Sequence, residues 1–411
     1  MQRANGVERS PGNVRQRKSA TTRHPPAALT APQVALPKRS PRTPARPAKA
    51  APGTTDLPRR ARLLIDWFNR SARDLPWRRT TDPYAIWVSE IMLQQTQVAT
   101  VIPYWERWLR EFPDPATLAA APEARVLKLW EGLGYYSRAR NLQRAAQTVV
   151  REHGSRLPDT VAGLKELAGI GPYTAGAIAS IAYNQPAALL DGNVIRVLTR
   201  HQAWPGDPRS RELNTRLWAE AQQLVDAAAR LTQPRNSGAV RNCSALNQAL
   251  MELGATVCTP TSPRCDDCPW QTTCAAKARG QTDRFPETAA RPKVELRYFA
   301  TALLRHKDRW LVRQRPTGIV NAGYWEFPNL ELPDNTEPRT ALAQWLGIPI
   351  QQLEAAGTLR HAITRYRMTQ HLYRADVPRA VALESARWVS PAELAELALT
   401  GPHRRLAATL A

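Results

Sequence analysis

The chain has 411 residues, a formal net charge of +22 and an isoelectric point near 10.6, so a polyanion is the first partner to consider. This length allows two or three domains with ample core. No run of about 18 apolar residues occurs, which excludes a membrane-spanning helix, and the basic N-terminus lacks the apolar stretch of a secretory signal.

The first 56 residues are rich in Pro, Ala, Arg, Lys and Thr and have no apolar periodicity. Residues 1–50 contain eleven Lys or Arg against a single acid, Glu8, and so contribute ten of the net positive charges. This composition predicts a disordered basic tail over 1–56. The tail either neutralises phosphates of DNA or RNA or serves only as a solubilising extension.

Helical periodicity begins at Leu57 and continues to about residue 278. Pro and Gly separate the periodic segments, as at 113–115, 157–159 and 168–172. The pattern predicts one all-α domain over 57–278. The segments with apolar residues at helical spacing are RLLIDWFNR, IWVSEIMLQQTQVATVIPYWERWLREF, VLKLWEGL, RARNLQRAAQTVVREHG, TAGAIASIAYN and ALNQALMELGATVC.

The segment WVSEIMLQQTQV (87–98) places one carboxylate, Glu90, in an otherwise apolar helical stretch. On a solvent-facing side Glu90 would be an ordinary surface charge, whereas a buried glutamate needs a partner or a raised pKa. A raised pKa would let Glu90 donate a proton near neutral pH. The amides that follow at 94, 95 and 97 suit base or phosphate contacts, or a polar helix face.

Two segments near the middle of the chain carry residues that could bind a phosphate or stabilise a charge at the start of a predicted helix. LAGIGPYTAGAIA (167–179) has Gly169 and Gly171 ahead of a helix that opens at Pro172. These glycines let the backbone approach a phosphate closely, although a purely structural helix hairpin has the same pattern. LLDGNVIRVLTR (189–200) begins a helix at Asp191, which suits both an N-cap and an ionised carboxylate that stabilises a cation.

Four of the five cysteines fall within CTPTSPRCDDCPWQTTC (258–274), and Cys243, the fifth, suits a core position. The spacing C-x6-C-x2-C-x5-C favours a [4Fe–4S] cluster first and an all-cysteine zinc site second, over four unrelated buried cysteines. Because metal-bound thiolates must stay reduced, we expect a cytosolic protein. The candidate ligands are Cys258, Cys265, Cys268 and Cys274.

A polar, charged stretch over 279–294 predicts a linker, after which the pattern changes. The segments YFATALLRH, RWLVRQRP, GYWEFPNLEL, QHLYRADV and ARWVS predict short strands, and PRTALAQWLG predicts a helix. The chain therefore ends in a smaller α+β domain over 295–411.

Five segments occur in a fixed order: RDLPWRRTTDPYAIWVSEIMLQQTQV, EGLGYYSRARNL, LAGIGPYTAGAIASIAY, LLDGNVIRVL and the cysteine loop. Together they resemble the adenine DNA glycosylase (MutY) family, within the helix-hairpin-helix, iron–sulfur glycosylase superfamily, over about 57–278. The distal domain resembles that family's Nudix-like recognition domain. The resemblance implies excision of adenine mispaired with 8-oxoguanine or G in double-stranded DNA, in base excision repair. We expect a monomer in the cytoplasm, associated with the nucleoid.

The resemblance also implies roles for individual residues. Glu90 falls at the general acid that protonates adenine N7, and Asp191 falls at the carboxylate that stabilises the oxocarbenium ion. Tyr173 stands where endonuclease III relatives hold a Schiff-base lysine, which favours a glycosylase without strong lyase activity. Asn193 falls at a residue that adjusts the carboxylates. The implied DNA contacts are Trp77 and Arg78 in the base pocket, Gln95 and Tyr135 as wedges in the duplex, and Gln248 at the adenine edge.

The distal domain departs from its relatives in two places. Many relatives carry Phe-Ser-His against 8-oxoguanine, where this chain has Ile363, Thr364 and Arg365, so a hydroxyl is kept and a guanidinium replaces the imidazole. PRTALAQWLG also lacks the carboxylates of Nudix hydrolases, which predicts binding without hydrolysis. Two alternatives stay open: an endonuclease III-like glycosylase/lyase for damaged pyrimidines, and a non-enzymatic iron–sulfur DNA-binding module.

Overall fold

The structure is a computed structural model that describes residues 56–232, 241–287, 293–316, 318–333 and 336–410. Apart from Asp56, the predicted basic tail lies outside the described residues.

The first part of the described chain is helical, with 3₁₀ turns at Pro76–Arg78 (η1) and Cys265–Asp267 (η2). None of the described helices is both long enough and apolar enough to cross a membrane. The α-helices are α1 (Leu57–Ser71), α2 (Pro83–Leu93), α3 (Val98–Glu111), α4 (Pro115–Ala120), α5 (Glu123–Trp130), α6 (Ser137–His153), α7 (Val161–Lys165), α8 (Pro172–Ile181), α9 (Gly192–Gln202), α10 (Arg211–Ala229), α11 (Asn242–Thr256) and α12 (Ala275–Ala278).

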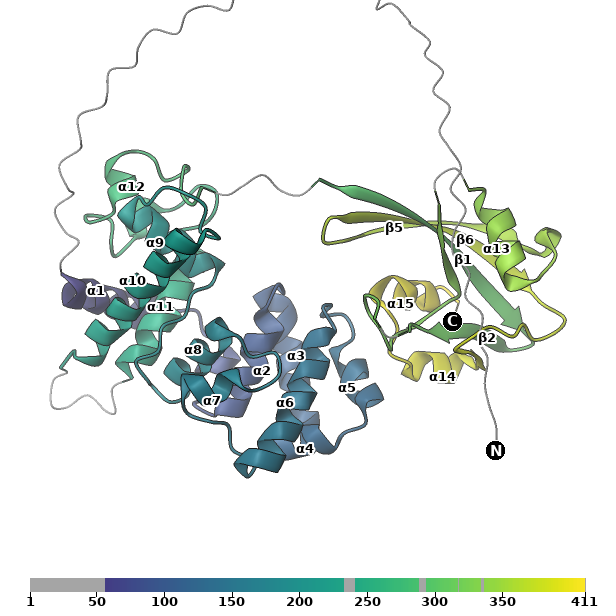
Figure 1. Cartoon of the computed structure of the whole chain (residues 1–411), viewed down its shortest axis with the longest axis horizontal. Helices are drawn as coiled ribbons and strands as arrows, with labels where there is room; N and C mark the ends of the chain where they lie inside the picture. Colours follow the sequence, from purple (N-terminus) through teal and green to yellow (C-terminus); the bar gives the residue numbers. More distant parts are fainter. Residues whose placement is uncertain (1–55, 233–240, 288–292, 317, 334–335, 411) are drawn as a thin grey trace, which may run out of the picture. The chain divides into compact units, whose positions relative to one another are not determined.

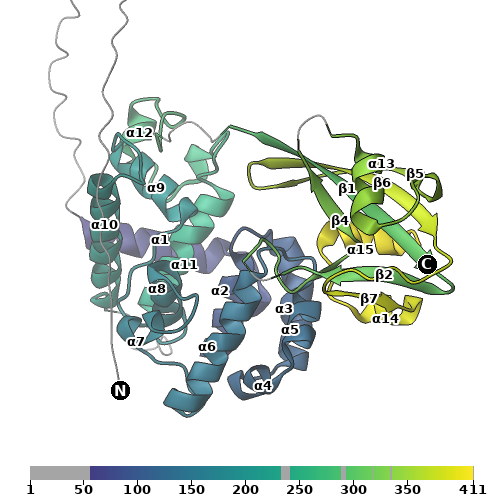
Figure 2. The same cartoon turned by 45° about the vertical axis from the view of Figure 1, so that its right-hand side comes forward.

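These helices form two groups, α2 to α8 and α1 with α9 to α12 (Figures 1 and 2). Helix α11 packs against α1, α9 and α10 and also contacts α8, so it joins the two groups. The close packing of α11 on α9 depends on Gly254, because a Cβ there would lie 2.5 Å from the Cβ of Asn193. The start of α9 is thereby held against α11.

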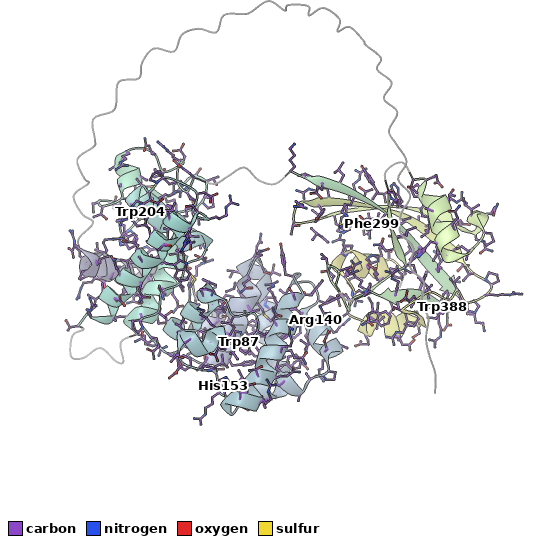
Figure 3. All side chains as sticks on the ribbon, in the orientation of Figure 1. Trp87, Arg140, His153, Trp204, Phe299 and Trp388 are labelled. Atoms are coloured by element: carbon purple, nitrogen blue, oxygen red, sulfur yellow. The ribbon has the colours of Figure 1, made fainter. Side chains whose placement is uncertain are left out.

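Helix α2 is buried on every side. Residues 84–92 are all buried, and Trp87 lies in the interior of the helical part (Figure 3). A helix that is apolar all round belongs in a core. Asp82 begins the helix by accepting hydrogen bonds from the backbone N–H groups of Tyr84 at 3.0 Å and Ala85 at 3.3 Å. Glu90 is the single acid in the buried run.

The second part of the chain is built on one sheet with strand order β3-β2-β1-β6-β5, in which β4 also pairs with β1 and β7 with β2. The central strands β1 and β6 are parallel, and the other pairs are antiparallel. The elements are β1 (Glu295–His306), β2 (Arg309–Gln314), β3 (Trp325–Glu326), β4 (Asn329–Leu332), α13 (Pro338–Leu346), η3 (Ile350–Gln352), β5 (Glu354–Ile363), β6 (Tyr366–Asp376), β7 (Ala386–Val389), α14 (Pro391–Glu396) and α15 (Gly401–Ala408).

The two faces of this sheet carry separate cores. Side chains alternate along β1, so Ala302 and Leu304 join a core with α13, while Leu303 joins a core with α14 and α15. Figure 1 shows α13 on the opposite side of the sheet from α14 and α15. The predicted fold class, an all-α domain followed by a smaller α+β Nudix-like domain, is confirmed.

Candidate active site

A cavity of about 550 Å³ lies between the two groups of helices. It is lined by residues of η1, α2, α8, α9 and α11, so residues from 73 to 255 meet at one place. A cavity of this size is typical of a small-molecule or base pocket. The predicted site residues that line it are Trp77, Arg78, Glu90, Gln95, Tyr173, Asp191, Asn193 and Gln248.

Glu90 is placed to hold a proton at neutral pH. Its side chain is buried, and the Tyr173 hydroxyl donates a hydrogen bond of 2.7 Å to its Oε2. Burial is the main cause that raises the pKa of Glu90 to about 7, and the nearby Asp191 acts in the same direction. Tyr173 and Arg78 oppose the rise. Burial also raises the pKa of the Tyr173 phenol well above its usual range, so Tyr173 stays a hydrogen-bond donor.

Asp191 caps α9, as its position in the sequence predicts. Its Oδ1 accepts from the backbone N–H of Val194 at 2.7 Å, and its Oδ2 accepts from Asn193 Nδ2 at 2.8 Å. Burial raises the pKa of Asp191, and these two hydrogen bonds oppose that rise. Because both oxygens act as acceptors next to the positive end of a helix, the site suits an ionised carboxylate.

Arg196 connects this carboxylate to the cysteine loop. Its Nη2 donates to Asn193 Oδ1 at 2.8 Å and to the Gly254 carbonyl at 2.8 Å, and its Nε donates to the Cys258 carbonyl at 2.7 Å. Asn193 in turn donates to Asp191. The sequence reasoning missed Arg196; the available signal was its place one turn after Asn193 on the same helix.

A third carboxylate in the cavity, Glu252, was also missed. Arg73 donates to its two oxygens at 2.7 and 2.8 Å, and Arg78 donates at 2.9 Å. Burial alone would raise the pKa of Glu252, but these hydrogen bonds hold it at about 2. The cavity thus contains Glu90, which can be protonated at neutral pH, and Glu252, which is ionised. Carboxyl groups whose pKa values are driven apart are typical of acid–base sites.

Two further side chains present polar and aromatic surface to the cavity. Trp77 is buried with its ring edge-on to Trp105, at 6.1 Å between centroids. Gln248 donates from Nε2 to Ser244 Oγ at 3.1 Å, and its amide lines the cavity. An aromatic wall with an amide edge suits a heterocyclic base.

Of the remaining predicted DNA contacts in the helical part, Gln95 lines the cavity, whereas Tyr135, Gly169 and Gly171 do not. Gln95 and Tyr135 both have left-handed backbone conformations, with φ of 58° and 47°, and both are exposed. Gly169, with φ of 79°, and Gly171, the N-cap of α8, form the turn between α7 and α8 and do not line the cavity.

Thr364 and Arg365 lie at the turn between β5 and β6 and do not line the cavity of about 550 Å³. Thr364 has a φ of 52°, and both side chains are exposed. The Arg365 guanidinium is paired with Glu295 at 2.9 Å and lies over the Tyr366 ring at 5.1 Å. The turn thus presents a hydroxyl and a cation to solvent.

The four candidate ligand cysteines line one small cavity of about 30 Å³, together with Arg200 and Lys277. Within the described residues, no three His, Cys, Asp or Glu side chains are arranged to hold a metal ion. Burial raises the pKa values of three of the thiols, to about 12 for Cys268. Arg200 donates to the Thr259 carbonyl at 2.6 Å and the Pro260 carbonyl at 3.0 Å, which fixes the loop. Cys243 is buried in the helical core.

Comparisons with known proteins agree with this arrangement. A family model for HhH-GPD superfamily base excision DNA repair proteins matches residues 88–223, and a NUDIX domain model matches residues 300–409. The chain is 36% identical over 427 residues to the adenine DNA glycosylase of Rattus norvegicus, with 89% of this chain and 80% of the rat protein covered. It is 37% identical over 404 residues to that of Mus musculus, covering 84% and 76%. For the Homo sapiens protein the identity is 36% over 407 residues, covering 84% and 72%.

Proposed function

Since the chain belongs to the adenine DNA glycosylase family of base excision DNA repair, we propose that it hydrolyses the N-glycosidic bond of adenine mispaired with 8-oxoguanine or G. The observation that carries the proposal is the convergence of Glu90 and Asp191 on one cavity, the first with a pKa near neutrality and the second held as a hydrogen-bond acceptor. Double-stranded DNA is the substrate, and the protein acts as a monomer.

The first step is protonation of the base. Adenine is a poor leaving group until a ring nitrogen carries a proton, so Glu90 delivers its proton to N7 of the extruded base. The bond between C1′ and N9 then breaks, and its electron pair leaves with the base. Tyr173 donates a hydrogen bond to the resulting Glu90 carboxylate, at the 2.7 Å contact already present.

The second step is stabilisation of the sugar. As the bond breaks, the sugar becomes an oxocarbenium ion, and Asp191 stabilises it through a transient bond to C1′ that water then hydrolyses with retention. Asn193 holds the Asp191 carboxylate in place through its 2.8 Å hydrogen bond. Because a tyrosine stands at position 173 instead of a lysine, no amine attacks C1′ there, and the strand remains intact.

The lesion opposite adenine is read by the second domain. Thr364 and Arg365, at the tip of the β5–β6 hairpin, offer a hydroxyl and a guanidinium to 8-oxoguanine. A guanidinium suits the acceptor atoms of a guanine edge. Both side chains are exposed, which supports a contact with a macromolecular ligand.

We propose further that Cys258, Cys265, Cys268 and Cys274 hold a [4Fe–4S] cluster. Support comes from the donor set, four thiols around one cavity, and from the neighbouring cations Arg200 and Lys277, which offset the charge of thiolates. A bound cluster would cross-link the loop 258–274, which lies at the end of the helical domain. Absorbance near 400 nm with about four irons per chain is the expected result, and a colourless zinc protein would overturn this assignment.

Three duplexes test the function. They carry adenine opposite 8-oxoguanine, adenine opposite G, and thymine glycol opposite adenine. We expect free adenine from the first two, strand cleavage only after alkali, and no reaction on the third. Glu90→Gln should abolish release while retaining duplex binding. Release of thymine glycol with direct strand cleavage would favour an endonuclease III-like enzyme, and binding without release from any duplex would favour a binding module.

A further inference from the structure

Arg138, in the first turn of α6, is a buried arginine whose guanidinium donates to backbone carbonyls of two segments, 91–94 and 133–134. It also donates to Thr96 Oγ1 at 3.3 Å. The carbonyl oxygens that accept from Nη1 and Nη2 are those of Ile91 (2.8 Å), Met92 (3.0 Å), Gln94 (2.6 Å), Leu133 (2.9 Å) and Gly134 (2.9 Å).

This guanidinium is compensated by dipoles and rings. Among the residues that the structure describes, no carboxylate forms a salt bridge with Arg138. Burial lowers its pKa to about 10, so it remains a cation at neutral pH. Its charge lies over the Trp130 ring at 5.2 Å and against the C-terminal carbonyls of α2, which have no partner within their own helix. A buried charge without compensation destabilises the folded state, so the loss of any of these contacts would be costly.

The segments that Arg138 binds end in the two predicted wedge residues. Gln95 directly follows Gln94, and Tyr135 directly follows Gly134. Both wedge residues have left-handed backbones, a conformation that costs a non-glycine residue roughly 1 kcal/mol and persists only where surrounding contacts enforce it. Both residues are exposed, and Gln95 lines the cavity that also contains Glu90 and Asp191.

We propose that Arg138 is a positioning residue for base extrusion, which orders the Gln95 and Tyr135 loops into one rigid wedge before DNA binds. This inference rests on the proposed function. A loop that is already ordered pays no ordering entropy when it enters the duplex, so the wedge lowers the barrier to extrusion rather than to bond cleavage. A lysine at position 138 would not make the same contacts, because an ammonium lacks the planar guanidinium group that donates to several carbonyls at once.

The test compares two substrates in single-turnover excision by Arg138→Lys and the unaltered protein. In the first duplex adenine is paired with 8-oxoguanine; in the second it faces an abasic-site analogue, where no base pair must open. On the first duplex, Arg138→Lys should excise adenine about tenfold or more slowly than the unaltered protein. On the second duplex, the two excision rates should differ by about threefold or less. Equal losses on both duplexes would overturn the proposal.

Arg241→Lys is the matched control. Arg241 also donates to helix C-terminal carbonyls, those of Ile181 and Ala182, but its hydrogen bonds reach neither wedge loop. Its substitution should affect both duplexes equally. If Arg138→Lys fails to fold by circular dichroism, Thr96→Val removes one acceptor of the same network and should give the same substrate dependence in weaker form.

A readout independent of bond cleavage separates this inference from the proposed function. In a Glu90→Gln background, 2-aminopurine next to the target adenine reports loss of stacking by fluorescence. Adding Arg138→Lys should slow and reduce the fluorescence rise. An unchanged fluorescence trace would overturn the positioning role even if excision is normal, and a failure of the unaltered protein to release adenine would instead count against the proposed function.

Discussion

Replacing Glu90 by Gln should stabilise the folded protein while it abolishes excision. Burial raises the pKa of Glu90 from 4.5 to about 7, so ionising this buried group costs folding free energy. Each pKa unit corresponds to about 1.4 kcal/mol, which gives a cost on the order of 3 kcal/mol once the carboxyl is ionised. Glutamine stays neutral at every pH and still offers an oxygen to the Tyr173 hydroxyl.

The pH dependence of this gain has a definite sign. The folded-state pKa of Glu90 lies above the unfolded value, so the proton stabilises the folded state fully below about pH 4.5 and that contribution is lost as the pH rises through about 7. The difference in unfolding free energy between Glu90→Gln and the unaltered protein should therefore be below about 1 kcal/mol at pH 5 and on the order of 3 kcal/mol at pH 8.

Urea unfolding followed by far-UV circular dichroism measures this difference, with both proteins at each pH so that other titrating groups cancel. Glu106→Gln is the control, because Glu106 is exposed on α3 and its substitution should have no comparable pH dependence. A stability difference for Glu90→Gln that is the same at pH 5 and pH 8 would refute burial as the cause of the raised pKa.

Four further outcomes follow from the site. With Glu90 as the acid, single-turnover excision should fall about tenfold per pH unit above about pH 7; a rate that rises above pH 7 contradicts the assignment. Asp191→Asn should lower the rate by about 100-fold or more with duplex affinity retained in gel shifts. Arg196→Gln removes the hydrogen bond to the Cys258 carbonyl, so the excision rate should fall and limited proteolysis within 258–274 should become faster. A change in only one of these two measurements would argue against a connection between Asp191 and the cysteine loop through Arg196. Arg365→Ala should narrow the preference for 8-oxoguanine over G in paired excision rates, and an unchanged ratio would remove Arg365 from lesion reading.

Much of the helical part and its two central carboxylates follows from local patterns. An apolar run with one acid left two readings of Glu90 open, a surface charge or a buried group, and the structure buries it on a helix that is apolar all round. An Asp ahead of an amphipathic segment predicts an N-cap, and Asp191 caps α9 through the Val194 N–H. The cap needed only neighbouring residues, whereas the burial of Glu90 is decided by the helices that pack around α2.

What the sequence did not reveal depends on contacts between distant segments. Glu252 looks like an ordinary helix residue until Arg73, 179 positions away, donates to both its oxygens. Arg138 looks like a surface charge at a helix start, because no local signal indicates that it will bind carbonyls of α2. Helix α14 is a different case. The capping box of Ser390 with Glu393 at its start is a local signal, but the interpretation of this part of the chain as strands overlooked it.

In the proposed reaction, helix α2 would link extrusion of the base to its protonation. Glu90 lies one residue before Ile91, whose carbonyl accepts from Arg138, and Gln95 follows five residues after Glu90. Glu90 lies in the last turn of α2, and Gln95 lies two residues beyond the end of that helix at Leu93. A shift of α2 would therefore displace the proposed proton donor, Glu90, and the proposed wedge residue, Gln95, together. The buried guanidinium of Arg138 binds the end of α2, so under the proposed function it would fix the distance between the wedge and the proton donor before DNA arrives.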